Sequence, residues 1–537
     1  MPGVNRRHLF RTATALASGA AAGSVLASPA QAAPTAGAEC PAPLGPVTVG
    51  PDDSRYPYLV DRGQQRWTGT PDEVRVVGST GQVVQAVQAA VDAGKRIAVR
   101  SGGHCAEGWV DDPAVRVVID MSGMTQVGYD ATRRAFVVEP GARLGEVYRR
   151  LVLGWGVTVP GGWCPGVGAG GHISGGGYGV LSRAMGLVVD HLYAVEVVVV
   201  GADGRASAVV ATGEASDPNR ELWWGHTGGG GGNFGVVTRY WLRSAGAEGD
   251  DPRRLLPAAP TETINFSAQW PWQALELDEA KFTRLIRNHT DWCEANSAPG
   301  AAATRLYADL TVGRKANDLN VASGQVYGPD ADRLLDEYLA ALGAGVGTPR
   351  NVARARQPWL AAALAGPDSS QYRLKIKSGY LRTGFSDAQL AAIYRNMTRE
   401  QDPGLLFGSV GIASYGGQIG AVAADATAFP HRDAVMRIQY TTAWADPARD
   451  ADYVDWLRTL YREVYADSGG VPAPEDGAYI NYPDDDLADP KVNTSKVPWS
   501  TLYYKGNYQR LQKVKATWDP KGVFGHTLGI RPPNSTR

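Results

Sequence analysis

The chain has 537 residues, of which 44% are hydrophobic, so it is long enough for two or three globular domains. Its formal net charge is −1 at pH 7 and no block of Lys or Arg occurs, which argues against nucleic acid or an anionic membrane as a partner. The four cysteines lack Cys-x-x-Cys spacing, so no metal site is expected; Cys40–Cys293 is the one disulfide that we consider.

Residues 1–33 are predicted to be a twin-arginine export signal that is removed from the mature protein. Arg6-Arg7 precede an Ala/Gly-rich apolar stretch, and Ala30-Gln31-Ala32 matches a cleavage site. The apolar part is too short and too weakly hydrophobic to remain as a membrane span. Twin-arginine export carries folded proteins, which suits a protein that receives a cofactor in the cytoplasm. We therefore expect an extracytoplasmic location.

From residue 45 to residue 245 helices alternate with short strands, which predicts an α+β domain. Apolar residues at helical spacing predict helices at Gln82–Ala93 and Leu144–Leu153. Short apolar runs predict strands at Arg96–Arg100, Val115–Asp120, Ala135–Glu139, Val157–Pro160 and Leu192–Val200.

Residues 246–475 predict a second domain in which helices cover a sheet. Helices are expected at Arg333–Leu342 and Tyr453–Tyr465, and strands at Thr263–Gln269 and Met436–Thr442. The Pro-rich segment Glu248–Pro260 is the expected crossing point between the domains. The tail from residue 476 to residue 537 is loop-rich and polar-aromatic.

Glycine is concentrated in three motifs, and 66 of the 537 residues are glycine. The motifs are RSGGH at 100–104, GGWCPGVGAGGHISGGGYG at 161–179 and GGGGGNFGVVT at 228–238. Glycine supplies ten of the nineteen residues at 161–179, so an ordinary helix is not expected there and the backbone is suited to lie against a flat or phosphorylated ligand. Residues 166–171 also match G-x-G-x-x-G, but more glycine follows where a dinucleotide-binding fold requires a helix, so that interpretation is rejected.

These motifs, together with Tyr479-Ile480-Asn481-Tyr482 and Asp519–Phe524, resemble the berberine-bridge-enzyme-like branch of the FAD-linked oxidases. Within that branch the resemblance is to the antibiotic-tailoring oxidases of actinomycetes. It implies an FAD domain of the vanillyl-alcohol-oxidase type at 45–245, completed by the segment 476–537. It also implies an inserted α/β substrate domain at 246–475, with an antiparallel sheet covered by helices.

The resemblance implies that FAD is bound by two covalent bonds, from His104 to the 8α-methyl group and from Cys164 to C6. An imidazole and a thiolate are nucleophiles able to add to an electron-poor flavin. Cys105 is interpreted as a packing residue. Valine at position 167 matches an oxygen gate and favours O2 as electron acceptor, and His172 is expected to donate toward N1 and C2 of the flavin. The full set of expected cofactor-binding residues is His104, Cys164, Arg100, Ser101, Gly102, Gly103, Val167, Gly168, Gly171, His172, Gly175, Gly176, Tyr178, Gly235, Val236, Val237, Tyr479 and Asn481.

Alcohol oxidation also needs a base that takes the hydroxyl proton. A tyrosine serves only if a neighbouring donor or cation stabilises its phenolate. We expect Tyr482 to be the base, assisted by Tyr415, with Tyr479 and Tyr178 as further candidates; roles as ordinary core residues stay open for all four. Strand alternation at 479–482 is expected to place Tyr479 and Asn481 on one face and Tyr482 on the other, so that only one set faces the substrate unless the strand kinks.

The sequence thus predicts a secreted FAD oxidase that uses O2 to convert a secondary alcohol of a sugar or antibiotic into a ketone, or a lactone or acid, with H2O2 as co-product. Oxidation of an allylic alcohol on a polyketide aglycone is an alternative. An extracellular carbohydrate-binding protein without catalysis is the alternative from another class. The sequence identifies neither the substrate nor the oligomeric state.

Overall fold

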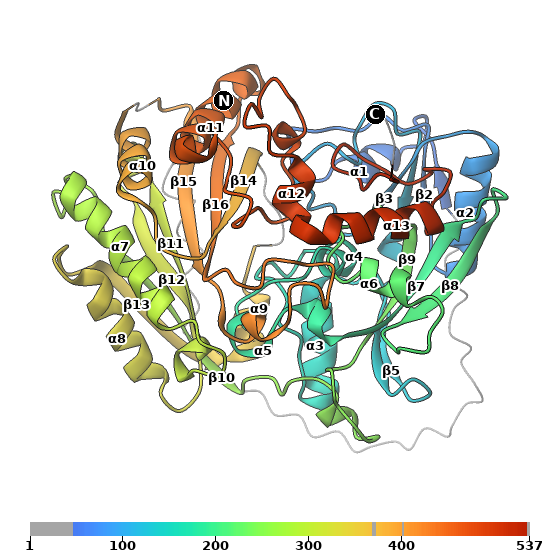
Figure 1. Cartoon of the computed structure of the whole chain (residues 1–537), viewed down its shortest axis with the longest axis horizontal. Coiled ribbons are helices and arrows are strands. Elements are labelled where there is room, and N and C mark those ends of the chain that lie inside the picture. Colours follow the sequence, from blue (N-terminus) through green and yellow to red (C-terminus); the bar gives the residue numbers. More distant parts are fainter. Residues whose placement is uncertain (1–46, 368–371, 400–401, 534–537) are drawn as a thin grey trace, which may run out of the picture. The chain divides into compact units, whose positions relative to one another are not determined.

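The structure, a computed structural model, describes residues 47–367, 372–399 and 402–533 (Figure 1). The predicted signal at 1–33 and Cys40 lie outside this part of the chain, so neither prediction is tested. Helices and three sheets make up the described residues, which confirms the predicted α+β class. In this part of the chain no helix is long and apolar enough to span a membrane.

The first sheet has four strands in the order β1-β2-β4-β3, and β2, β4 and β3 are parallel. Helix α2 packs against it through Val83, Val87 and neighbouring apolar residues. The helix begins two residues before the predicted one because Ser79 caps it, accepting a hydrogen bond from the backbone N–H of Gln82. The bounds are α1 Tyr56–Val60, α2 Thr80–Asp92, β1 Val47–Val49, β2 Glu73–Val76, β3 Ile97–Arg100 and β4 Val117–Asp120.

The second sheet has five antiparallel strands in the order β5-β6-β9-β7-β8. Strand β7, which lies between β9 and β8, has the predicted bounds, because an apolar run interrupted only by Glu196 is typical of a strand buried on both faces. The bounds are β5 Val127–Asp130, β6 Ala135–Val138, β7 Leu192–Val200, β8 Ala206–Thr212 and β9 Val236–Leu242, with helices α3 Leu144–Trp155, α4 Ala169–Ser174, α5 Ser182–Met185 and α6 Arg220–Gly225.

Two local predictions in this part of the chain were wrong. The run 157–160 is no strand: Val157 forms only an isolated bridge with Ala258. Conversely, the short helix α4 lies inside the glycine-rich stretch, because Ala169 and Ile173 are buried in the core and anchor it. The argument against a dinucleotide-binding fold from a missing helix therefore fails. What is absent in the described residues is the strand that would have to precede that helix.

The third sheet has seven antiparallel strands in the order β13-β10-β12-β11-β15-β16-β14 (Figure 1). Helices α7, α8, α10 and α11 pack on one of its faces. The strands are β10 Glu262–Gln269, β11 Leu306–Gly313, β12 Asn320–Val326, β13 Arg350–Pro358, β14 Arg373–Leu381, β15 Leu405–Ser414 and β16 Met436–Trp444; the helices are α7 Glu279–Ala295, α8 Ala331–Gly343, α9 Trp359–Leu364, α10 Asp387–Arg399 and α11 Asp450–Val464.

The two faces of this sheet differ in polarity. Leu310, Ile412 and Ile438 are aligned across β11, β15 and β16 and are fully buried with the helices. The residues one position away point to the opposite face, where Asp309 and Arg437 flank Ala413 in register. A polar face of this kind can be kept only where it meets water, another domain or a ligand.

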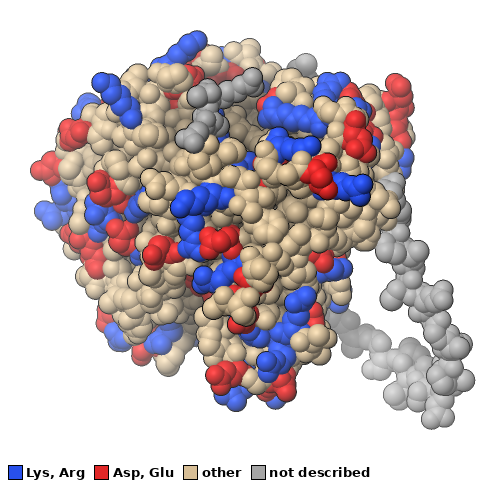
Figure 2. All heavy atoms as spheres, turned by 45° about the vertical axis from the view of Figure 1, so that its right-hand side comes forward, with Lys and Arg blue, Asp and Glu red and all other residues tan. Residues whose placement is uncertain are grey.

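The end of the chain returns to the glycine motif at 228–232. Helix α13 (Tyr508–Trp518) packs on α6 and follows helix α12 (Trp499–Tyr504). Lys515 donates to the carbonyl oxygen of Asn233 at 2.6 Å, and Tyr504 donates to that of Gly229 at 2.8 Å. On the face drawn in Figure 2, acidic and basic side chains of the described residues are interspersed, in keeping with the net charge near zero.

Candidate active site

The first two glycine motifs lie backbone against backbone. A Cβ atom on Gly102 would lie 2.3 Å from the backbone nitrogen of Gly168, and one on Gly168 would lie 2.0 Å from Oγ of Ser101. No side chain fits either position, so glycine is required for the loops to meet. Ser101 fixes the contact further by donating to the carbonyl oxygen of Pro140 at 2.5 Å.

This junction presents groups that fit a phosphorylated, flat cofactor. The backbone N–H groups of Ser101, Gly102 and Gly103 donate to no acceptor among the described residues. Nearby, a Cβ on Gly171 would meet no atom within 4 Å, and one on Gly231 would meet only Cα of Gly171 at 4.0 Å. Successive free N–H groups bind anions, and bare backbone lets a ring approach closely. The residues present therefore fit FAD.

The predicted flavin-linking residues stand on these two loops, and His172 lies between them. His104 follows β3 and is exposed, and Cys164 is half-buried. Nε2 of His172 accepts a hydrogen bond from the backbone N–H of Gly162 at 3.0 Å. Burial, together with a smaller contribution from the charge of His104, lowers the pKa of His172 to about 4. The neutral ring thus carries its hydrogen on Nδ1, which is available to donate.

The two cysteines near the site differ in their surroundings. Burial raises the pKa of Cys105 to about 12, although the guanidinium of Arg62 opposes this. The Cys105 thiol therefore stays protonated at neutral pH, which agrees with its interpretation as a packing residue. Beside Cys164, Tyr148 donates to the carbonyl oxygen of Gly162 at 2.7 Å.

The four predicted tyrosines form one cluster, and two of them flank an arginine that sequence reasoning missed. The guanidinium carbon of Arg437 lies 4.9 Å from the ring centroid of Tyr178 and 4.7 Å from that of Tyr482. The Tyr178 ring lies 5.1 Å from that of Tyr415, and the Tyr479 ring lies 5.3 Å from that of Tyr482. Nε and Nη1 of Arg437 are buried without a hydrogen-bond partner in the described residues. An arginine inside the apolar run Met436–Thr442 was the signal that could have identified it.

The tyrosine hydroxyls are not equivalent. Tyr178 donates to the carbonyl oxygen of Ser414 at 2.6 Å, and burial raises its pKa while Arg437 opposes the rise. Burial raises the pKa of Tyr415 well above its ordinary value, and that of Tyr479 to about 12. Tyr482 is the half-buried member of the four. These differences favour Tyr482 as the hydroxyl that exchanges a proton with a ligand.

The predicted strand at 479–482 is instead a turn. The backbone N–H of Tyr482 donates to the carbonyl oxygen of Tyr479 at 2.9 Å, so both rings lie on the same side. Asn481 stabilises the turn through Nδ2, which donates to the Tyr479 hydroxyl and to the carbonyl oxygen of His172, each at 3.0 Å. The prediction that strand alternation places Tyr479 and Tyr482 on opposite faces was therefore wrong.

Several other predicted cofactor-binding residues have packing contacts. The guanidinium of Arg100 is engaged by Asp120 and by the carbonyl oxygen of Leu59, so its side chain is occupied. A Cβ on Gly175 would lie 2.0 Å from Asn481, one on Gly176 would lie 2.7 Å from Phe429, and one on Gly235 would lie 2.5 Å from the carbonyl oxygen of Val198. Val236 is buried in β9, Val237 is half-buried there, and the backbone N–H of Val167 donates to Cys164 in a turn.

The polar sheet face adjoins the tyrosine cluster. The rings of Tyr307 on β11 and Tyr178 lie 6.3 Å apart. Burial raises the pKa of Asp309, also on β11, and Arg437 opposes the rise. Asn265 and Gln325 are paired in register on β10 and β12, and their amide oxygens are buried without partners among the described residues. Buried polar atoms of this kind are normally satisfied, so a ligand that donates hydrogen bonds fits here.

Residues 71–208 match an FAD binding domain family, and residues 478–531 match a family described as berberine and berberine like. The chain is 52% identical over 505 residues to the aclacinomycin-N/aclacinomycin-A oxidase of Streptomyces galilaeus, covering 93% of this chain and 92% of that protein. It is 33% identical to the hexose oxidase of Chondrus crispus, covering 89% and 93% of the two chains.

Solved structures agree with the sequence matches. A glycopeptide hexose oxidase complexed with teicoplanin superposes with a TM-score of 0.88 at 50% identity, covering 92% of this chain and 100% of the other. Aclacinomycin oxidoreductase superposes with a TM-score of 0.87 at 51% identity, covering 91% of this chain and 100% of the other.

Proposed function

The chain belongs to the berberine-bridge-enzyme-like family of FAD-dependent oxidases, and from this premise we propose that it oxidises a secondary alcohol of a sugar or glycosylated antibiotic with a bicovalently bound flavin. The product is a ketone, or a lactone or acid. The observation that carries the proposal is the meeting of two loops, one with His104 and one with Cys164, next to a cluster of tyrosines around Arg437.

FAD would be held by backbone and by two side chains. The free N–H groups at 101–103 suit its phosphates, and His104 and Cys164 would link the ring at the 8α-methyl group and at C6. Bound FAD supplies the acceptor for the hydride. Links at its edge leave its face open to a bulky substrate and raise its potential. His172, neutral and with Nδ1–H available, suits a role as donor to the flavin.

The substrate's hydroxyl proton passes to Tyr482 in this proposal. Arg437 stabilises the resulting charge because its guanidinium lies against the Tyr482 ring. Tyr178 is committed to the carbonyl oxygen of Ser414 and holds the other side of the arginine. Tyr415 lies behind Tyr178, so its assistance to Tyr482 is indirect.

The substrate class follows from the polar sheet face and from the relatives. Amide oxygens of Asn265 and Gln325 need hydrogen-bond donors, which the hydroxyl groups of a sugar supply. Two relatives bear the names aclacinomycin-N/aclacinomycin-A oxidase and hexose oxidase, and a third, a glycopeptide hexose oxidase, was solved in complex with teicoplanin. Valine at position 167 suits O2 as the acceptor, and the leader at 1–33 suits export by the twin-arginine route.

The test combines attachment and turnover. Peptide mass spectrometry of the wild type should find flavin on both His104 and Cys164. His104→Ala and Cys164→Ala should each keep one link, and the double variant should release FAD on denaturation. Flavin retained by the denatured double variant would assign the links to other residues.

Anaerobic bleaching of the flavin by a panel of sugars, antibiotic glycosides and free aglycones then identifies the substrate. Reduction by aglycones alone would favour the allylic-alcohol alternative. A colourless protein that binds sugars would favour a carbohydrate-binding protein without catalysis.

A further inference from the structure

The loop that carries His104 is held by its carbonyl oxygens. Arg62 donates to the carbonyl oxygens of Gly103 at 3.3 Å and of Cys105 at 3.0 Å. Gln64 and Trp67 both donate to the carbonyl oxygen of Ala106, at 3.1 and 3.2 Å. The segment 62–67 therefore donates hydrogen bonds to the loop both before His104, at Gly103, and after it, at Cys105 and Ala106.

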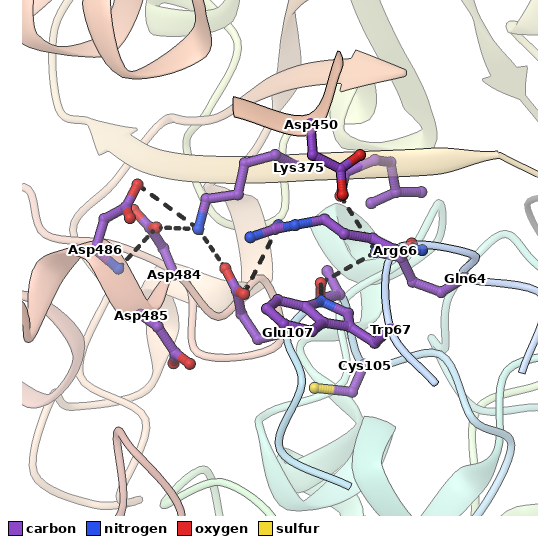
Figure 3. A network of polar contacts seen from close by, with 12 residues as sticks. Gln64, Arg66, Trp67, Cys105, Glu107, Lys375, Asp450, Asp484, Asp485 and Asp486 are labelled. Atoms are coloured by element: carbon purple, nitrogen blue, oxygen red, sulfur yellow. Dashed lines mark hydrogen bonds and ion pairs between the residues drawn. The ribbon is translucent and has the colours of Figure 1, made fainter. Parts of the chain in front are cut away.

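The same loop is clamped from its other side by a buried charge. Glu107, three residues after His104, forms an ion pair with Lys375 and lies 3.8 Å from Arg66 (Figure 3). Lys375 also contacts Asp484 at 2.7 Å and Asp486 at 3.7 Å. The side chains of Glu107 and Lys375 are 2% and 1% exposed, so each charge depends on its ion-pair partners, and not on water, for compensation.

Lys375 belongs to a distant part of the chain. It stands on β14, which is an edge strand of the seven-stranded sheet. Gln64 reinforces this junction, because its Nε2 also donates to the carbonyl oxygen of Leu374, next to Lys375 on β14, at 3.2 Å. The His104 loop thus touches the sheet of the predicted substrate domain directly.

Buried ion pairs contribute little net stability compared with apolar packing. Removing one partner of such a pair is nevertheless strongly destabilising, because it leaves the other charge buried without compensation. Their use here is therefore geometric: Lys375 is the nearest cation to Glu107, closer than Arg66, and holds the buried carboxylate in one place. Cys164 lacks this dependence, since its loop is fixed on α3, where Leu144 and Gly145 donate backbone N–H groups to Val167 and Pro165, each at 2.9 Å.

We propose that the Lys375–Glu107 pair positions the loop of His104 for attachment to the flavin, so that the histidyl link forms only when β14 is docked against it. The inference rests on the proposed bicovalent attachment. In that reaction the imidazole nitrogen replaces one hydrogen of the 8α-methyl group, and the two electrons and two protons released pass to dioxygen. The pair acts through the loop, so Lys375 and Glu107 are positioning residues.

The chain offers a matched control two residues along the same strand. Lys377 is equally buried and contacts Asp484 at 2.6 Å and Asp486 at 2.7 Å, but among the described ion pairs it has none with Glu107. Lys377→Met therefore removes a charge from the same cluster and leaves the clamp on the loop in place.

The experiment measures flavin occupancy at the two sites separately, by mass spectrometry of peptides from the soluble full-length protein. Lys375→Met should lower occupancy of His104 at least 10-fold relative to Cys164, Lys377→Met should leave the ratio unchanged, and Lys375→Arg should restore it. If Lys375→Met is insoluble, Glu107→Gln tests the same pair.

Two outcomes would overturn the proposal. Equal loss at His104 and Cys164 would mean that the pair only stabilises the fold. An unchanged ratio in Lys375→Met, or in Glu107→Gln where Lys375→Met is insoluble, would mean that the loop positions His104 without it. A wild type that carries no flavin on either residue would instead refute the proposed function on which the inference rests.

Discussion

Replacing Arg437 by glutamine should slow substrate oxidation by about 100-fold at neutral pH. The guanidinium carbon lies 4.7 Å from the centroid of the Tyr482 ring, and Arg437 itself is buried. Two unit charges about 5 Å apart interact by about 3 kcal/mol at an effective dielectric constant of about 20. Since about 1.4 kcal/mol corresponds to a factor of ten, losing this stabilisation of the phenolate costs about two orders of magnitude in rate.

The assay is anaerobic stopped-flow reduction of the bound flavin at saturating substrate, followed from pH 6 to pH 10. The deficit of Arg437→Gln should narrow as the pH rises, because a more basic medium favours the phenolate without help from the cation. Arg437→Lys keeps the charge and should recover part of the rate. Peptide mass spectrometry on the same samples shows whether flavin attachment is intact.

Two results would refute this reasoning. A reduction rate that stays within a factor of three of the wild type would mean that the arginine does not stabilise charge in the transition state. A constant deficit at every pH, accompanied by weaker substrate binding, would mean that Arg437 only orients the substrate.

Three further predictions concern single side chains. Tyr482→Phe should slow flavin reduction by about 100-fold or more with attachment unchanged, and unaltered single-turnover reduction would exclude it as the base. Burial raises the pKa of Asp485 to about 6 from its ordinary value of 3.8. Between these two pH values the folded state therefore binds more protons than the unfolded state. The contribution of Asp485 to the free energy of unfolding is lost as the pH rises from about 4 to about 6. Asp485→Asn keeps an acceptor for Trp109 and should raise the free energy of unfolding at pH 7 by at most about 3 kcal/mol, with little gain at pH 4 in denaturant titrations. Gly102→Ala would place a Cβ 2.3 Å from a facing backbone nitrogen and should abolish FAD loading, whereas Gly128→Ala, with open space around it, should load normally in a flavin absorbance assay.

Local pattern was enough to predict elements whose stability is decided locally or by simple burial. The helix predicted at Gln82–Ala93 from apolar spacing is α2 at Thr80–Asp92, and β7 follows from an apolar run interrupted only by Glu196. The run at 157–160 and the turn at 479–482 were mistaken because their partners decide their conformation. Val157 finds only Ala258 to pair with, and the turn is set by Asn481 bridging to His172, more than 300 residues earlier.

The same limit applies to the site. Motifs with a fixed local sequence, such as those of His104 and Cys164, could be assigned by resemblance. Glu107 and Lys375 lie 268 positions apart and belong to no motif, so nothing local pairs them. Arg437 was detectable only as one charged residue in an apolar strand. Its role beside the tyrosines is visible only in the structure, where Tyr178 lies against one side of the guanidinium and Tyr482 against the other.

The position of that arginine also explains why a cluster of tyrosines can serve a reaction that needs a base. Burial disfavours the charged form of a phenol, and it raises the pKa of Tyr178, Tyr415 and Tyr479 above the ordinary value. A phenolate is tenable in such surroundings only next to a cation. Arg437 touches Tyr178 and Tyr482, and the hydroxyl of Tyr178 is already committed to Ser414. Tyr482 is therefore the one tyrosine of this cluster that Arg437 contacts and whose hydroxyl donates to no acceptor in the described residues, so it is the acceptor for the proton of the substrate.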